Sequence, residues 1–206
     1  MASMQAAEKP EKRTRGRPRA FDREAALDGA MRLFWEKGYE AASVDALGAA
    51  MGIGPSSLYA AFGDKARLFQ AAIERYENGP GAFRTAILAE APSAREAVEG
   101  LLRAAAEAFT RPGRPSGCMV GLIAAAAPQR RALQAAVKGR LDRAMKSGEL
   151  AAATDAAGLA AYFTAVLHGL SVQARDGADA RQLAETARLA MRAWPAEAQV
   201  RRHGTF

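Results

Sequence analysis

The sequence predicts an all-α protein, with an N-terminal helix-turn-helix domain followed by a C-terminal helical bundle. Alanine, the strongest helix former, supplies about a quarter of the 206 residues. Apolar residues recur at helical spacing, whereas the alternation of apolar and polar residues that strands require is almost absent. Glycines, prolines and capping residues divide the chain into separate helices. We therefore expect helices throughout the folded part.

Four short helices are expected in residues 21–78. Their predicted ranges are 23–37, 44–51, 55–61 and a fourth from residue 65. Each begins or ends at a residue suited to that place, namely the caps Ser43 and Asp64, the first-turn proline Pro55, and the stops Gly38 and Gly52. Two short helices joined by a glycine-containing turn, with an apolar helix on each side, form a helix-turn-helix unit with its own small core.

The C-terminal part, residues 79–195, is expected to contain longer amphipathic helices. Proline and glycine at residues 79–81 interrupt or end the fourth helix, and Ser93 with Glu96 forms a capping box for the next one. After a loop at residues 111–117, helices are expected at about 118–127, 128–147, 154–176 and 179–194. Residues 196–206 are expected to form a polar tail.

Positive charge is concentrated near the N-terminus. The chain carries a net charge of +7, and residues 9–19 hold six basic residues and one acid, hence five of these seven charges. Proline, glycine and like-charge repulsion keep such a segment extended, so residues 1–20 are predicted to be a flexible basic arm. Arg15, Arg17 and Arg19 suit insertion into an A·T-rich minor groove. A solvated tail that only aids solubility is the alternative.

Composition disfavours several other classes of protein. One cysteine excludes an internal disulfide and, with only two histidines, leaves no Cys/His zinc site, so no metal and no cofactor are expected. The N-terminus lacks the apolar segment of a signal peptide, which favours a cytoplasmic protein. Residues 156–174 contain no Asp, Glu, Lys or Arg, but their glycine, histidine and alanine content favours a buried or interface helix over a membrane span.

The third predicted helix is the candidate for contacting DNA bases. Leu58 and Phe62 lie one turn apart and are expected in the core. Small or hydroxyl-bearing residues remain at its start and outer face: Gly54, Pro55, Ser56, Ser57, Ala60 and Ala61. Such residues let a helix approach the major groove closely. Ser43, Tyr59 and Lys65 are expected to reach phosphates, with capping or core packing as the alternative for each.

Residues of the predicted helix-turn-helix domain resemble those of a known family. Residues 21–69 contain Ala30–Phe34, Lys37–Tyr39, Ser43–Asp45, Gly52–Ile53, Ser57–Tyr59, Phe62, Asp64–Lys65 and Leu68–Phe69 at fixed spacings. This pattern closely resembles the DNA-binding domain of TetR/AcrR-type transcriptional regulators. The resemblance implies operator contacts by Ser43, Ser56, Ser57, Tyr59 and Lys65. Ala60 and Ala61 stand where aromatic or histidine residues often follow the tyrosine, so the operator sequence does not follow from the resemblance.

Over the rest of the chain the resemblance extends to architecture only. It implies an inducer pocket within the C-terminal helices and a homodimer that pairs the last two helices of each subunit. The candidate dimer residues are apolar and lie on those helices: Leu159, Phe163, Val166, Leu167, Leu170, Leu183, Ala187, Met191 and Trp194. The candidate effector-pocket residues are aromatic, sulfur-containing or histidine: Phe83, Phe109, Cys118, Met119, Tyr162 and His168. Ordinary core packing is the alternative for these six, and Cys118 is also a candidate redox or electrophile sensor.

The favoured function is that of a homodimeric, ligand-responsive transcriptional regulator that binds a palindromic operator in double-stranded DNA. The resemblance implies a repressor more often than an activator, and no enzyme. The main alternative is an all-α small-molecule-binding protein or enzyme with an incidental basic arm, although the sequence contains no catalytic constellation. A further alternative is an architectural DNA-binding protein that acts through the arm without sequence specificity.

Overall fold

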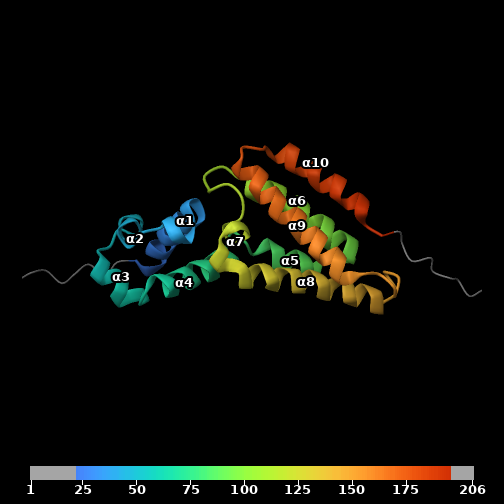
Figure 1. The fold of residues 1–206 in the computed structure, drawn as a ribbon, viewed down its shortest axis with the longest axis horizontal. Coiled ribbons are helices and arrows are strands. Elements are labelled where there is room, and N and C mark those ends of the chain that lie inside the picture. The colour runs from blue at the N-terminus through green and yellow to red at the C-terminus, as the bar shows by residue number, and fades with distance from the viewer. Residues whose placement is uncertain (1–21, 196–206) are drawn as a thin grey trace, which may run out of the picture.

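The structure is a computed structural model that describes residues 22–195, and within that range it contains helices and loops but no strand. The helices form an elongated molecule, with a small N-terminal domain at one end and a larger helical body at the other (Figure 1). The predicted all-α fold class is therefore confirmed. The predicted basic arm, residues 1–20, and the polar tail, residues 196–206, lie outside the described residues.

The N-terminal domain has the four predicted helices, which are α1 (Arg23–Ala41), α2 (Val44–Met51), α3 (Pro55–Phe62) and α4 (Lys65–Asn78). The first helix was predicted to stop at Gly38; this glycine does leave the helical conformation, with φ +79°, but the chain resumes a helical course to Ala41. Ser43 and Asp64 cap α2 and α4 as predicted, because their side-chain oxygens accept from the backbone N–H groups of Ala46 and Arg67.

An aromatic core holds this domain together. The buried rings of Phe34 and Phe69 meet edge to face with centroids 5.0 Å apart. Tyr39 packs against Phe69 at 4.9 Å, and Leu58 and Phe62 point inward from α3. Since α3 contributes two buried side chains to this core, its opposite face is held in a fixed orientation toward solvent.

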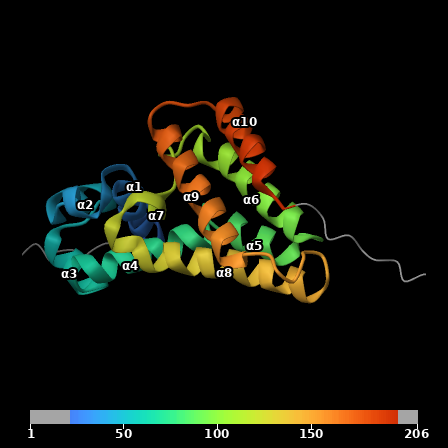
Figure 2. The ribbon, with the colours of Figure 1, turned by 45° about the vertical axis from the view of Figure 1, so that its right-hand side comes forward.

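The helical body contains α5 (Phe83–Glu90), α6 (Ala94–Phe109), α7 (Met119–Leu122), α8 (Ala127–Lys146), α9 (Ala156–Arg175) and α10 (Ala180–Ala190). Helix α9 lies between α6 and α8, and α10 packs on α6 and α9 (Figure 2). The sequence did not predict α5. This helix has only eight residues, and Ala82 at its N-terminus offers no side-chain cap, so it carries no start signal.

Two predicted boundaries in the body were wrong in detail. The single helix expected at residues 118–127 is divided, because Ile123 has an extended backbone (ψ 121°) and separates α7 from a 3-10 turn at Ala124–Ala126. The helix expected to reach Trp194 leaves the α conformation after Ala190 and ends in a 3-10 turn over Met191–Ala193. In the first case four alanines at residues 124–127 continue the helical composition past the true end, and in the second no proline or glycine precedes Pro195 to mark it.

The predicted capping box at Ser93 is half formed. The Ser93 hydroxyl accepts from the N–H of Glu96 at 3.1 Å, but the Glu96 side chain does not make the return bond. A complete capping box stands instead at Asp179 and Gln182, where both reciprocal bonds are present. None of the described helices is long and apolar enough to cross a membrane.

Candidate nucleic-acid interface

The turn between α2 and α3 is fixed by its backbone. Gly52 ends α2 in the left-handed conformation (φ +68°), and the N–H of Ile53 donates to the carbonyl of Gly48 at 3.0 Å. A Cβ at Gly48 would lie 2.8 Å from the Ile53 carbonyl oxygen, so only glycine permits this close reversal. The chain then enters α3 at Pro55.

Helices α1 and α2 touch backbone to backbone at Gly29. A Cβ at this position would overlap the carbonyl oxygen of Ala50. The glycine therefore sets how closely α2, and with it α3, approaches α1. Sequence reasoning missed Gly29, whose one signal is its place inside a helix, where glycine is unfavourable by about 0.5–1 kcal/mol relative to alanine.

The outer face of α3 is exposed and polar. Ser56 and Ser57 are exposed, and Tyr59 retains 50% of its accessible surface, whereas Leu58 and Phe62 are buried as predicted. Within residues 22–195 no hydrogen bond engages the hydroxyl groups of Ser56, Ser57 or Tyr59. Figure 1 places α2 and α3 at the end of the molecule remote from α10. These hydroxyl groups are therefore available to an external partner.

Ser43 and Lys65 flank that face and already have local partners. The exposed Ser43 accepts from Ala46 as a cap, which leaves its own O–H free to donate. The Lys65 Nζ lies 4.5 Å above the centre of the Tyr39 ring and 3.4 Å from the carbonyl oxygen of Glu40. An ammonium group has three donors, so this anchoring leaves Lys65 able to bond a phosphate as well.

An ion-pair cluster braces α4 against α1. The Nε and Nη2 atoms of Arg75 lie 2.8 and 2.9 Å from the two carboxylate oxygens of Asp28, and Nη1 donates to Glu24. The hydrogen bond with Asp28, followed by its charge, raises the pKa of Arg75. This brace holds the two helices that support α2 and α3.

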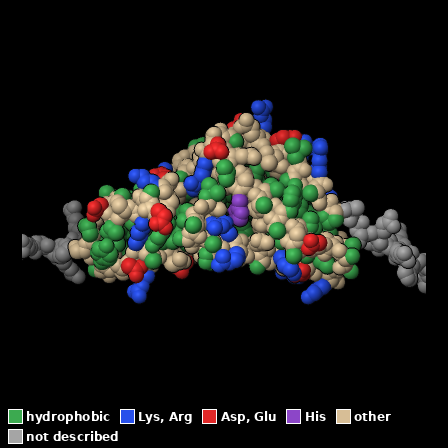
Figure 3. Space-filling model, in the orientation of Figure 1, with side chains coloured by type: hydrophobic (Ala, Val, Ile, Leu, Met, Phe, Trp, Pro, Cys, Tyr) green, Lys and Arg blue, Asp and Glu red, His purple; other side chains and the backbone are tan. Residues whose placement is uncertain are grey.

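The folded part is close to electrically neutral. The net charge of +7, less the +5 of residues 9–19, leaves +2 for the remaining chain. On the face that Figure 3 shows, Lys and Arg side chains are interspersed with Asp and Glu. The arm residues predicted to contact DNA, which are Arg15, Arg17 and Arg19, lie outside the described residues.

The six predicted effector-pocket residues do not gather around one cavity. Phe109 and Met119 are almost fully buried, at 1% and 0% exposure, and Phe83 is half-buried. Tyr162 retains 41% of its surface on the outer side of α9. His168 is half-buried, and its burial, together with the charges of nearby arginines, lowers its pKa.

Cys118 belongs to a buried polar cluster at the junction of α4, α7 and α9. The Tyr76 hydroxyl donates to the Cys118 Sγ at 3.3 Å, and Nη1 of the buried Arg84 lies 4.0 Å from the same sulfur. The backbone N–H of Cys118 donates to the Ser171 hydroxyl at 2.8 Å. Burial, and the neighbouring thiol, raise the pKa of Tyr76. In residues 22–195 no three His, Cys, Asp or Glu side chains lie close enough to hold a metal ion.

Most predicted dimer residues are used within the protomer. Phe163, Leu167, Leu170 and Leu183 are at most 2% exposed, and Ala187, Met191 and Trp194 are also buried. Leu159 and Val166 are half-buried. The exposed residues of α9 and α10 include the apolar Ala161, Tyr162, Ala165, Val172 and Leu189, and α10 also exposes charged side chains such as Arg181, Glu185 and Arg188. Sequence reasoning assigned the inner apolar side of α9 to a partner because this helix is apolar on all sides.

Comparison with known proteins agrees with this geometry. The family model described as bacterial regulatory proteins, tetR family, matches residues 26–72. The repressor ComR of Escherichia coli K12 is 36% identical over an alignment of 197 positions, and the match covers 89% of this chain and 94% of ComR. The repressor BdcR of the same organism is 34% identical over 190 residues, covering 88% of this chain and 93% of BdcR.

A solved structure of the TetR-family regulator CifR, a cysteine mutant in complex with a 26-base-pair operator duplex, is similar along most of the chain. Its sequence identity is 44% and its TM-score 0.83, and the match covers 87% of this chain and all of that one. A TetR regulator from Rhodococcus sp. RHA1 is 38% identical with a TM-score of 0.56. The helix-turn-helix signature, the all-α body and relatives of matching length all agree, so the chain belongs to the tetR family of bacterial transcriptional regulators.

Proposed function

We propose that this protein is a ligand-responsive repressor that binds a palindromic operator as a homodimer in the cytoplasm, where bacterial DNA lies. The outer face of α3 carries the proposal, because it presents small and hydroxyl-bearing residues on a helix whose other side is locked into a core. Two relatives that align with most of this chain are named as repressors, and CifR was solved on operator DNA.

The proposed contacts divide into two kinds. Gly54, Pro55, Ser56 and Ser57 are exposed at the start of α3, where their small size lets the helix backbone enter a major groove. Ser43, Tyr59 and Lys65 surround that entry and are assigned to phosphates, which position the helix without selecting sequence. The arginines of the basic arm, Arg15, Arg17 and Arg19, are assigned to the neighbouring minor groove.

The proposed dimer uses the exposed side of α9 and α10. Ala161 and Ala165 are small enough to let two helices approach closely, and Tyr162, Val172 and Leu189 supply exposed apolar surface beside them. A twofold axis at this surface doubles the contacts of a single α3 and explains why the operator must be palindromic. The buried residues Phe163, Leu167 and Leu170 then support the interface from within each protomer.

The proposed response to an effector is a change in the spacing of the two α3 helices. An effector that binds the helical body more tightly in one spacing shifts the population toward it, and the operator favours the other. Cys118, Met119 and His168 lie at or next to the α4–α7–α9 junction, so a ligand there touches both domains. We therefore retain Cys118, Met119 and His168 as candidate effector contacts. Phe83, Phe109 and Tyr162 are less suited to that role.

A fluorescence-anisotropy titration with the protein's own upstream DNA tests this proposal. We expect specific binding at physiological salt, with a duplex of scrambled sequence bound on the order of 10³-fold more weakly or worse. The double variant Ser56→Ala, Ser57→Ala should lose discrimination between the two duplexes. Ser116→Ala, which removes another exposed hydroxyl in the body, is the matched control and should bind as the parent does.

Two outcomes would reject the proposal. The first is equal affinity for the upstream and scrambled duplexes, which leaves a non-specific DNA-binding protein. The second is a monomer at the protein concentrations where the operator is bound, measured by sedimentation or light scattering. The single change Tyr162→Arg in the exposed α9 surface should itself shift the protein toward monomer, because it places like charges opposite each other across the twofold axis.

A further inference from the structure

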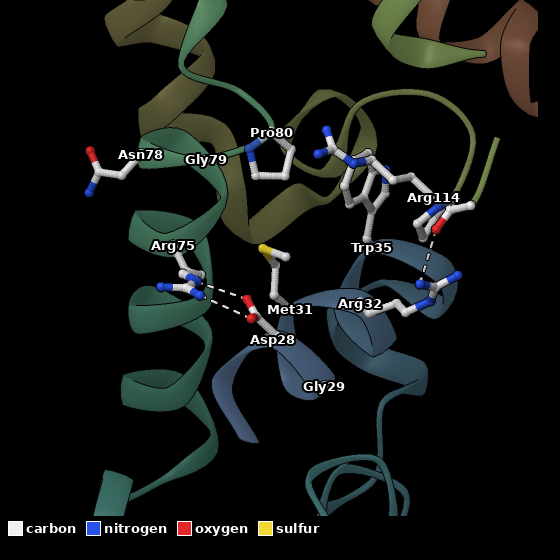
Figure 4. A pocket seen from close by; sticks show the side chains of 12 residues that line it. Asp28, Gly29, Met31, Arg32, Trp35, Arg75, Asn78, Gly79, Pro80 and Arg114 are labelled. Carbon is white, nitrogen blue, oxygen red and sulfur yellow. Dashed lines mark hydrogen bonds and ion pairs between the residues drawn. The ribbon is translucent and has the colours of Figure 1, made fainter. Parts of the chain in front are cut away.

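A cavity of about 520 Å³ lies between the N-terminal domain and the helical body (Figure 4). Helix α1 forms one wall, the end of α4 with residues 78–80 forms another, and the loop at residues 113–115 forms the third. This volume is within the range of small-molecule sites, about 300–1,000 Å³. None of the residues assigned above to DNA, the dimer or the effector lines this cavity.

The lining combines apolar and flat surfaces. Met31 and Trp35 of α1 extend toward Pro80 (Figure 4), and Pro115 of the loop also lines the cavity. Trp35 is 4% exposed and is held in place because its Nε1–H donates to the carbonyl of Gly117 at 3.2 Å. A fixed indole beside two prolines suits the body of an aromatic or similarly flat ligand.

The charges around the cavity are almost all compensated. Arg75 is engaged by Asp28 and Glu24, as described above. Arg32 pairs with Glu36 at 3.2 Å and donates to the carbonyl of Gly113 at 3.1 Å. Arg114 also lines the cavity, is exposed, and forms no ion pair with any residue between 22 and 195. Arg114 is therefore the one guanidinium among the lining residues that no carboxylate of residues 22–195 pairs, whereas Arg75 is shared by two carboxylates.

We propose that this cavity binds a small organic monoanion with a flat apolar body, of the aromatic carboxylate class. The carboxylate pairs with the Arg114 guanidinium, a planar fork that matches two oxygens, and the ring packs against Trp35 and Met31. A cation is disfavoured by Arg114, and a neutral analogue of the same shape forfeits the ion pair.

A ligand in this cavity would affect how the N-terminal domain is oriented relative to the helical body. Gly113 and Gly117, on either side of Arg114, are bonded to Arg32 and Trp35 of α1. A ligand held between α1 and this loop thus touches both domains and favours one relative orientation of α3. This consequence rests on the proposed function, whereas binding itself does not.

Titration with sodium benzoate in the absence of DNA tests the site. The chain has two tryptophans, so Trp194→Phe isolates the fluorescence of Trp35, and calorimetry on the unaltered protein provides a second measurement. We expect saturable binding with Kd on the order of 1 mM, which suits a ligand of this size. Benzamide, the neutral analogue, should bind at least about 10-fold more weakly, in line with the loss of a charge-assisted pair.

Substitutions at two arginines of the loop provide the decisive comparison. Arg114→Ala should weaken benzoate binding about 10-fold or more, and Arg114→Lys should restore part of it. Arg111→Ala removes an exposed arginine of the same loop that does not line the cavity, so benzoate affinity should stay within about twofold of the parent's. Equal benzoate affinity in the Arg114→Ala protein and its parent, or no saturable signal, overturns the site.

A parallel operator titration tests the coupling. Saturating benzoate, compared with acetate at equal ionic strength, should change the operator Kd about fivefold or more. An unchanged operator Kd overturns the coupling. Absence of specific operator binding counts against the proposed function instead, because the benzoate titration contains no DNA.

Discussion

Gly29→Ala is a direct test of how α1 positions α2. The added methyl group would overlap the carbonyl oxygen of Ala50, which belongs to the backbone of α2 and cannot rotate away. The two helices must therefore move apart, and α2 carries the turn and α3 with it. We expect this variant both to unfold more easily and to bind the operator more weakly.

The size of the stability change follows from two opposing terms. Replacing a helical glycine by alanine favours the helix by about 0.5–1 kcal/mol. Forcing a methyl group into a closed contact costs about 1–3 kcal/mol, and a rigid backbone partner places Gly29 at the upper end of that range. With a cost of about 2–3 kcal/mol at that upper end, the net loss is about 1–2.5 kcal/mol, which lowers Tm by roughly 2–10 °C in a chain of this length.

Gly139→Ala in α8 is the matched control. The nearest side-chain atom to its added Cβ is Nη1 of Arg143 at 3.9 Å, an ordinary van der Waals distance. Only the helix-favouring term then applies, so Tm should rise by roughly 1–4 °C. Thermal unfolding followed by circular dichroism measures both variants. A Tm at or above the parent's for Gly29→Ala, alongside the expected rise for Gly139→Ala, would refute the close contact between α1 and α2.

Three further predictions concern the core, the arm and pH. Leu58→Ala removes a fully buried side chain and should lower the free energy of unfolding in urea by about 2–5 kcal/mol, a loss that an unchanged urea midpoint would contradict. Deletion of residues 1–20 should weaken operator binding but leave its sequence specificity. The slope of log affinity against log salt concentration should become shallower by about 0.9 for each phosphate that the arm neutralises. Complete loss of binding would favour the architectural alternative instead. The pKa of His168 is lowered in the folded state, so the unfolded chain binds the proton first and stability falls as pH drops below about 6.5. His168→Gln should flatten the plot of unfolding free energy against pH below that value. Identical plots for this variant and its parent would contradict the assignment.

The N-terminal domain was predicted well because its signals are local. Ser43, Asp64 and Pro55 act on the helix ends beside them, and Gly52 acts on its own backbone. Helical spacing likewise separated Leu58, which is buried, from its exposed neighbours on α3. Such features depend on residues within about one turn of each other, so a short stretch of sequence contains the whole signal.

The contacts that the sequence did not predict join residues far apart in the chain. The indole of Trp35 bonds a carbonyl 82 positions away, and Gly29 meets Ala50 across two helices. On α9 the sequence does not show which side of the helix is buried. A helix that is apolar all round has no polar face to mark its outside, so the sequence did not separate Phe163, which is buried, from Tyr162, which is exposed.

Trp35 determines how motion can pass between the two domains. Its indole donates to Gly117, and its own carbonyl accepts from Nη2 of Arg175 at 3.0 Å, so the same residue is held from the loop and from the end of α9. Sliding α1 past the body would strand buried polar groups, at about 1–3 kcal/mol for each. Rotation of α1 together with the loop and the end of α9 retains both bonds. A signal that reaches α3 from the body is therefore expected to turn the N-terminal domain as a unit.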